Sequence, residues 1–195
     1  MKKIVVLLNI PRFAIHYLLV RHDVFCQEDF SRWVAILRNG QKACLMTFVD
    51  LMFFFPVFRS LILARISVHH QYLAHILAFL GKPLPLLEID CKHIEGGLYI
   101  QHGFATIIAP KSIGKNCWIN QCVTIGYTNA TDCPTIGDNV SIGAGAKVLG
   151  KCIVGNNVKI GANCVVVKNV PNNATVVGNP AYIVRLNGER VSIRL

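Results

Sequence analysis

The chain has 195 residues, of which 53% are apolar and only 15% are charged, so a sizeable core is expected and both a disordered chain and a coiled coil are excluded. Its 20 basic and 10 acidic residues give a net charge of +10, with ten of the basic residues in each of the segments 1–90 and 91–195. Without a basic run or an aromatic stacking motif no nucleic-acid partner is expected, and the excess favours phosphate-bearing ligands in general.

The first 87 residues have a helical pattern. Their apolar residues are concentrated in the stretches 5–20, 43–58 and 61–80, and the turn sequence GKPLP at 81–85 follows the last of them. The stretch 43–58 is apolar on both helix faces, which is typical of a helix that is buried or lies in lipid. Sixteen residues are short for a membrane span. Packing against protein is therefore the first interpretation, and a helix lying on an anionic membrane surface is the second.

The N-terminal segment and the cysteines indicate the cellular compartment. The apolar run 4–8 is cut at Asn9 and Pro11, so no cleaved signal peptide is expected. The eight cysteines form no C-x-x-C pair and are expected to be reduced. We therefore expect a cytoplasmic protein, at the inner face of the membrane if the N-terminal helices bind lipid. The region's histidines lack metal-ligand spacing, predict no metal site, and are expected on helix surfaces: His16, His22, His69, His70 and His75.

From residue 88 an aliphatic residue recurs every six positions. The series has two interruptions, one extra residue before Ile107 and five extra residues before Ile136. Its members are Ile94, Ile100, Ile107, Ile113, Ile119, Ile125, Ile136, Ile142, Val148, Val154, Ile160 and Val166. Short strands joined by turns at this period predict a solenoid of hexapeptide coils, about five in number. The fold class expected is mainly β, a parallel β-helix preceded by an α-helical N-terminal region.

The positions between the aliphatic residues agree with this prediction. Asn or Gly follows three positions after many of them, which suits a tight turn with a left-handed backbone. Small residues four positions after them, Cys117, Cys152 and Cys164 among them, are expected to line a narrow interior. The insertion 126–135 breaks the register and is expected to protrude as a loop. The predicted domains are 1–87 (helical), 88–186 (β-helix) and 187–195 (C-terminal tail).

The segments Ile142–Gly150 (IGAGAKVLG) and Gly178–Ala181 (GNPA) resemble the hexapeptide-repeat acyltransferases. More narrowly, Gly96–Ile108, Val123–Gly126 and Cys133–Gly137 are similar to the serine acetyltransferase branch, and the helical half is similar to its polysaccharide-associated subgroup. The resemblance implies a left-handed β-helix, a homotrimer, acetyl-CoA as donor, and an active site between neighbouring prisms. It also implies a histidine general base, for which His102 is the matching residue.

The chemistry asks for such a base independently, because a hydroxyl attacks a thioester poorly until a group near neutrality removes its proton. A carboxylate that orients the imidazole would stabilise the imidazolium. Glu88 lies near the family's acidic position, but the intervening segment is one residue shorter than the resemblance implies, so Asp90 remains an alternative.

Two departures from the family pattern concern the acceptor. The cysteine-pathway enzymes carry Asp directly before the base and a second His before a Pro in the loop, where this chain has Gln101 and Cys133. A neutral amide suits hydroxyls better than an ammonium group. We therefore expect Gln101, Cys133 and Asp90 to bind the acceptor.

The donor site is expected along the groove between prisms, where small residues let a pantetheine arm approach and cations meet its phosphates. The residues expected to bind acetyl-CoA are Thr124, Gly126, Gly143, Ala144, Gly161, Ala162, Lys168, Asn179 and Arg185. The function expected is O-acetylation of a hydroxyl, on a glycan of a surface polysaccharide or on another small molecule. The alternatives are serine O-acetylation for cysteine biosynthesis and a non-catalytic scaffold that docks through its N-terminal helices, with peripheral membrane contact.

Overall fold

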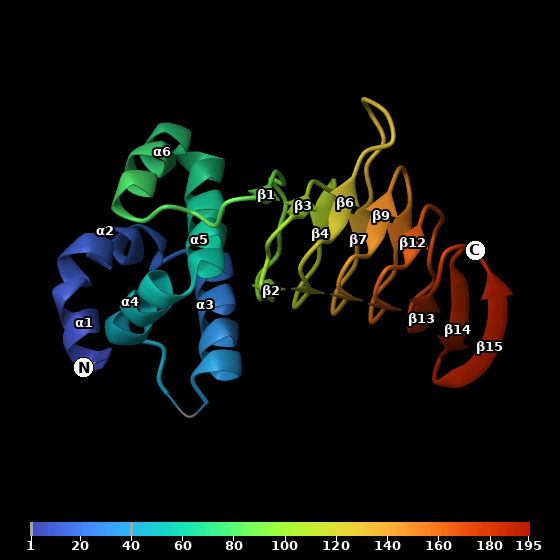
Figure 1. Cartoon of the computed structure of the whole chain (residues 1–195), viewed down its shortest axis with the longest axis horizontal. Helices are drawn as coiled ribbons and strands as arrows, with labels where there is room; N and C mark the ends of the chain where they lie inside the picture. Colours follow the sequence, from blue (N-terminus) through green and yellow to red (C-terminus); the bar gives the residue numbers. More distant parts are fainter. Residues whose placement is uncertain (1, 40) are drawn as a thin grey trace. The chain divides into compact units, whose positions relative to one another are not determined.

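The computed structural model describes residues 2–39 and 41–195, and the chain divides into two compact units, residues 1–85 and 86–195 (Figure 1). The first unit is helical and the second is built of short strands. The division falls between Pro85 and Leu86, whereas the sequence placed a boundary between residues 87 and 88.

The helices of the first unit are shorter than the apolar stretches that predicted them. The first stretch forms two helices that meet at Asn9 with a bend of 69°. The second stretch is broken before Pro56, where the bend is 111°, and the third is divided at His70. The helix over residues 24–37 lies outside the three predicted apolar stretches, and Asp23 caps its start by accepting from the Cys26 amide. The helices are α1 (Lys2–Leu8), α2 (Ile10–Val20), α3 (Val24–Leu37), α4 (Leu45–Phe54), α5 (Pro56–His69) and α6 (Gln71–Leu80).

The stretch 43–58 supplies the core of this unit. Phe48, Val49, Leu51, Met52 and Phe58 are fully buried. The rings of Phe48 and Phe58 pack edge to face with centroids 5.7 Å apart. Packing against protein, the first interpretation of this stretch, is therefore confirmed, and the interpretation of this helix as one lying on a membrane is wrong.

Two carboxylates of the helical unit are bound to arginines. Asp29 of α3 is fully buried and accepts from Arg65 Nε at 2.9 Å, while Asp50 of α4 accepts from Arg38 Nε at 2.6 Å. Leaving either carboxylate buried without its guanidinium would carry a large desolvation cost. These arginines therefore serve the internal structure of the unit.

His16 lies inside the unit, so its predicted place on a helix surface is wrong. Its side chain is fully buried on α2, and neither ring nitrogen makes a well-formed hydrogen bond with the described residues. The pKa of His16 is lowered to about 4, and burial is the largest cause. The Leu77 backbone opposes this shift, while the charges of Arg12 and Arg59 act in the same direction as burial. The cause of the error is that α2 is apolar on both faces, so its pattern does not show which face is buried.

The second unit is a parallel β-helix in which three strands make one coil (Figure 1). Sheet A contains β1 (Leu87–Ile89), β3 (Thr106–Ile108), β6 (Thr124–Gly126), β9 (Lys147–Leu149) and β12 (Val165–Val166). Sheet B contains β4 (Ser112–Ile113), β7 (Thr135–Ile136) and β10 (Ile153–Val154). Sheet C contains β2 (Tyr99–Ile100), β5 (Trp118–Ile119), β8 (Ser141–Ile142), β11 (Lys159–Ile160), β13 (Ala174–Val177), β14 (Tyr182–Leu186) and β15 (Glu189–Arg194). The prediction of about five coils is confirmed by the five strands of sheet A.

The aliphatic series points inward with one correction. Ile108, which pairs with Ile125, is fully buried, while Ile107 is 41% exposed, so the sequence assigned the wrong one of the two to the interior. The turn at 101–105 is longer than a hexapeptide turn, which shifts the register by one more residue than predicted. The predicted interior places of Cys117, Cys152 and Cys164 are confirmed, because all three are buried.

One row of turns is joined by an asparagine ladder. Asn139, Asn157, Asn173 and Asn187 all have positive φ, and each Nδ2 donates to the Oδ1 of the next asparagine at 2.9–3.2 Å. Asparagine enters the left-handed region more easily than most residues. The ladder thus links four successive turns through side chains.

Two segments leave the regular prism. Residues 127–131 are exposed in the predicted loop, whose Asp132 carboxylate accepts from the amides of Thr128 and Asn129. Residues 187–195, expected to be a tail, instead contain β15, which pairs with β14 in an antiparallel hairpin at the end of sheet C. The protrusion of the loop is confirmed (Figure 1).

Candidate active site

The residues expected at the site belong to two corners of the prism. The C–A corner comprises the turns from sheet C to sheet A, at residues 101–105, 120–123, 143–146 and 161–164. The A–B corner comprises the segments that leave sheet A, beginning at residues 90, 109, 127, 150 and 167. A three-residue strand of sheet A, about 10 Å long, separates the two corners within one chain.

His102 is on the first turn of the C–A corner. Its side chain is exposed and its φ is +64°, a conformation that histidine adopts more readily than most residues. The turn is held by backbone bonds, because the amide of Gln101 donates to Ile119 and the amide of Cys122 donates to Phe104. Within the described part of the chain, no hydrogen bond or ion pair joins the ring to Glu88 or Asp90. The pairing predicted for the base and its carboxylate is thus not made inside a single subunit.

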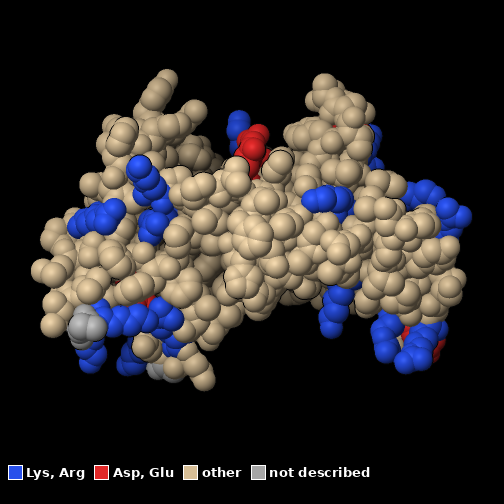
Figure 2. All heavy atoms as spheres, viewed as in Figure 1, with Lys and Arg blue, Asp and Glu red and all other residues tan. Residues whose placement is uncertain are grey.

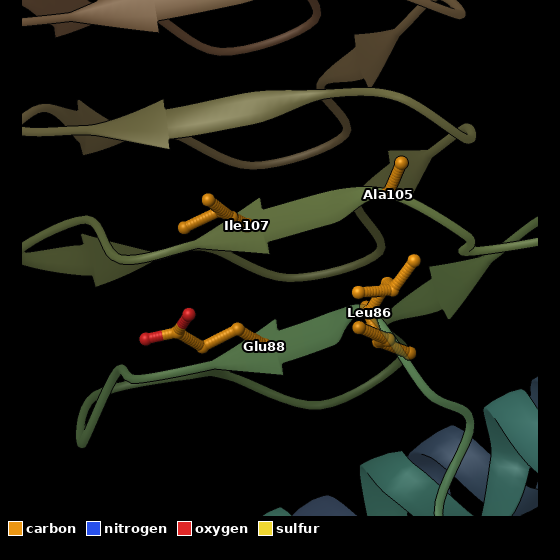
Figure 3. A pocket seen from close by; sticks show the side chains of 5 residues that line it. Leu86, Glu88, Ala105 and Ile107 are labelled. Atoms are coloured by element: carbon orange, nitrogen blue, oxygen red, sulfur yellow. The ribbon is translucent and has the colours of Figure 1, made fainter.

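Glu88 projects from β1 onto the outer face of sheet A, next to Ile107 of β3 (Figure 3). It lines a hollow of about 460 Å³ whose other walls are apolar, formed by Leu86, Leu87, Ala105 and Ile107. Ala105 belongs to the same turn as His102, so the hollow borders the turn that carries the candidate base. The sequence analysis did not predict these apolar walls, because it assigned the side chain of Ile107 to the interior of the prism.

Thr124 lies on the same face of sheet A, one strand beyond Ile107. Its hydroxyl accepts a hydrogen bond from Lys147 Nζ at 3.1 Å, and the same ammonium donates to the Cys122 carbonyl at 2.7 Å. Lys147 was not among the predicted site residues. Lys147 pairs with Thr124 in the register of β6 and β9. An alignment of the sequence coil by coil would have placed the two residues side by side.

The predicted donor residues continue along the C–A corner. Sheet C pairs Ile100 with Ile119, Ile119 with Ile142 and Ile142 with Ile160, so the residues that follow them stack from coil to coil. Phe104, and not His102, is in line with Ala144 and Ala162, because the amides of Cys122, Gly145 and Asn163 donate to the carbonyls of Phe104, Gln121 and Ala144 in turn. His102 lies in the extra length of the first turn, at the same corner. A Cβ on Gly143 would lie 2.7 Å from the Ala162 amide nitrogen, so this glycine is required by the stacking of coils.

The A–B corner holds the other predicted residues. Asp90 follows β1 there, Gly126 is the last residue of β6, Lys168 follows β12, and Cys133 closes the loop after β6. A Cβ on Gly126 would have no neighbour within 4 Å, so a ligand has room to approach that backbone. Asn179 follows β13 at the end of the C–A corner and is exposed, as is Lys168.

Tyr127 is a further residue of the A–B corner that the sequence did not single out. Its side-chain hydrogen bond with Cys133 raises the pKa of the phenol, and the charge of Asp90 acts in the same direction. Tyr127 and Cys133 therefore lie close together at this corner. The adjacency arises because the loop returns to its own starting point, which sequence spacing does not show.

Arg185 lies apart from both corners. It is on the hairpin strand β14, where its Nη1 donates to the Gly188 carbonyl at 3.3 Å and its partner in β13 is Thr175. Among residues 2–39 and 41–195 no three His, Cys, Asp or Glu side chains gather as metal ligands. The structure thus places His102 at the same corner as the Gly143 and Gly161 turns, and Asp90, Gly126 and Cys133 at the opposite edge of sheet A.

Comparison with known proteins identifies relatives of this chain and of its fold. Residues 133–168 match the family model described as bacterial transferase hexapeptide (six repeats). Over 165 residues the chain is 36% identical to a serine acetyltransferase of Synechococcus elongatus, covering 79% of this chain and 64% of the relative. Over 98 residues it is 49% identical to a Staphylococcus aureus serine acetyltransferase, covering 48% of this chain and 46% of the relative. Neisseria gonorrhoeae serine acetyltransferase in complex with serine superposes with a TM-score of 0.66 at 27% identity, covering 87% of this chain and 73% of that chain.

The repeat segment thus has the fold of the hexapeptide-repeat transferases, and the likeness confirms the left-handed β-helix. Within that class the chain is homologous to the serine acetyltransferases. The polysaccharide-associated subgroup, which the sequence favoured, receives no support from these relatives. The chain spans between about half and two thirds of the length of the curated relatives that it matches.

Proposed function

We propose that this protein is an acetyl-CoA-dependent O-acetyltransferase in which His102 is the general base. The observation that carries the proposal is the C–A corner, where the exposed side chain of His102 belongs to the same row of turns as Ala144 and Ala162, on a prism homologous to serine acetyltransferases. Small residues there leave the backbone accessible to a pantetheine arm.

In the proposed reaction the acceptor hydroxyl oxygen attacks the carbonyl carbon of the acetyl thioester. His102 takes the hydroxyl proton as the new C–O bond forms, and the C–S bond then breaks. The proton passes from the imidazolium to the departing thiolate of coenzyme A. The products are an acetyl ester and free coenzyme A, and the base returns to its neutral form.

The proposal includes a homotrimer, because the two corners are separated within one chain. In a trimer of parallel prisms the C–A corner of one subunit faces the A–B corner of the next. A carboxylate for His102, absent inside the subunit, then comes from Asp90 or Glu88 of a neighbour. All eight cysteines are free thiols, which supports a reducing compartment, and we place the protein in the cytoplasm.

Serine is the first candidate acceptor, since the relatives that match the chain are serine acetyltransferases. A sugar hydroxyl is the second candidate, and the neutral amide of Gln101 beside the base is the observation that favours it. An amide provides a donor and an acceptor for hydroxyl groups but no charge for the amino group of serine. Surface-polysaccharide acetylation is the form of this second candidate that the sequence suggested.

The test measures thiol release from acetyl-CoA with L-serine and, separately, with nucleotide sugars and short glycans. Turnover on serine that increases in Gln101→Asp supports the first candidate. Turnover only on a sugar, lowered in Gln101→Asp, supports the second. No thiol release and no binding of acetyl-CoA by the purified trimer would overturn the enzymatic proposal in favour of a scaffold.

A further inference from the structure

The first two helices expose an apolar face that the core of the helical unit does not use. The face has the spacing of one side of a helix, continued from α1 to α2. We call it the N-terminal apolar face, and its residues, with exposed fractions, are Ile4 (61%), Leu7 (53%), Leu8 (75%), Ile15 (43%), Leu18 (55%) and Leu19 (41%).

The opposite side of the same helices already makes the internal contacts. Val6, Phe13, His16 and Val20 are buried in the unit, so the exposed residues are a second apolar face rather than a misassigned core. A fully exposed leucine forgoes a burial free energy of about 1.5–3 kcal/mol. Contiguous apolar surface of this kind marks an interaction site.

The charges beside this face have one sign. Residues 1–22 contain Lys2, Lys3, Arg12 and Arg21 and no carboxylate. In the rest of the unit, Asp29 is bound to Arg65, and Asp50 is bound to Arg38 and lies 3.8 Å from the ammonium of Lys2. Asp23 caps a helix, which leaves Glu28 as the exposed acidic side chain of residues 1–85. Figure 2 shows the consequence, with Lys and Arg gathered over the helical unit and little Asp or Glu on that side.

This charge pattern decides between two occupants. A second copy of the same face would bring the four cations of one α1–α2 pair toward those of the other, which is unfavourable. An anionic lipid surface complements them and accepts the apolar side chains beneath its headgroups. We propose that the N-terminal apolar face docks the protein peripherally on a membrane that contains anionic lipid.

The dimensions fit docking in the plane of the membrane. α1 and α2 have 7 and 11 residues and meet at 69°, and within the described residues no single helix is long and apolar enough to cross a bilayer. Helices of this length reach about 10 and 17 Å, less than the hydrocarbon thickness of about 30 Å. α6, which packs on α2, adds the exposed side chains of Tyr72, Ile76 and Phe79, and aromatic rings suit the boundary between lipid and water.

The test is co-sedimentation of the full chain with vesicles of phosphatidylcholine alone and of phosphatidylcholine with about 30% phosphatidylglycerol. We expect binding to the anionic vesicles only. Leu8→Gln/Leu18→Gln is expected to weaken it about tenfold or more, and Lys3→Gln/Arg21→Gln to weaken it about tenfold with a reduced salt dependence. The control Ile153→Gln/Ile193→Gln removes two exposed aliphatic residues of the prism and should bind like the unchanged chain.

Helical circular dichroism shows that each variant is folded, and the docking proposal does not depend on the catalytic one. Absence of binding to anionic vesicles by the unchanged chain would overturn it. Equal binding by the folded Leu8→Gln/Leu18→Gln variant would overturn it as well. A lower mass of that variant in light scattering, without any vesicle binding, would identify the face as a contact between copies instead.

Discussion

Lys147 Nζ lies 3.1 Å from Thr124 Oγ1, so the ammonium group of β9 donates a hydrogen bond to the hydroxyl of the neighbouring strand β6. An ammonium group can only donate, so the threonine oxygen is the acceptor in this pair. The hydroxyl proton of Thr124 therefore remains available for another acceptor. The thioester carbonyl of the proposed donor is a group of that kind.

Removal of either partner is expected to weaken donor binding. Thr124→Val should raise the KM for acetyl-CoA about threefold to tenfold, the effect of one hydrogen bond. Lys147→Met should raise it less, because it loses the orientation of the hydroxyl and keeps the hydroxyl itself. In the double variant the KM should equal that of Thr124→Val, since the lysine acts through the threonine. Steady-state kinetics checks this, and multiplicative effects would show that the two residues act independently.

His102→Asn is the variant that tests the base. Asparagine tolerates the positive φ of this turn, so the backbone is expected to keep its conformation. The turnover number should fall about 10²–10⁴-fold, while the KM for acetyl-CoA and the mass of the oligomer stay unchanged. Turnover within about threefold of the unchanged protein would remove His102 from the role of base.

The asparagine ladder predicts a difference between two substitutions at one turn. Asn157 has a φ of +58° and bonds to Asn139 and Asn173. Asn157→Ala loses both bonds and strains the turn, with an expected loss of about 2 kcal/mol in the free energy of unfolding. Asn157→Gly loses the bonds without the strain, so its loss in the free energy of unfolding should be about half as large. Urea denaturation measures both variants, and equal losses would show that backbone strain has no part in the preference for asparagine.

The buried imidazole of His16 predicts acid sensitivity of the helical unit. Burial lowers its pKa from 6.5 to about 4, so between these values the unfolded chain binds a proton that the folded chain does not. Stability is therefore complete above pH 6.5 and decreases as the pH falls toward 4, by up to about 3 kcal/mol. His16→Leu should flatten this part of the profile, whereas His75→Gln, at an exposed position, should not. An unchanged slope in His16→Leu would assign the acid sensitivity to other groups.

Much of the β-helix can be predicted from the sequence because each coil repeats the same local sequence pattern. An inward aliphatic residue, a small residue four positions later and an asparagine or glycine in the turn specify the same geometry wherever they occur, as the buried Cys117 and the positive φ of Asn157 show. The repeat fails at Ile107 and Ile108, where the turn that carries His102 has its own length. Because no other coil contains a turn of this length, the repeat pattern does not predict where the register resumes after it.

The helical unit shows the opposite case. When a helix is apolar on two sides, periodicity does not tell which side faces the core. His16 of α2 was therefore expected on the surface and is buried. The segment of α4, for which a membrane surface was the second interpretation, lies in the core. The sequence nevertheless predicted a chemistry for the candidate site, because residue types such as His102 and Glu88 carry it. It did not show that these residues make no pair within one chain, or that Tyr127 meets Cys133. Those relationships join positions far apart along the chain or across a loop, and they arise only when the coils stack and each side chain acquires neighbours that its own hexapeptide does not contain.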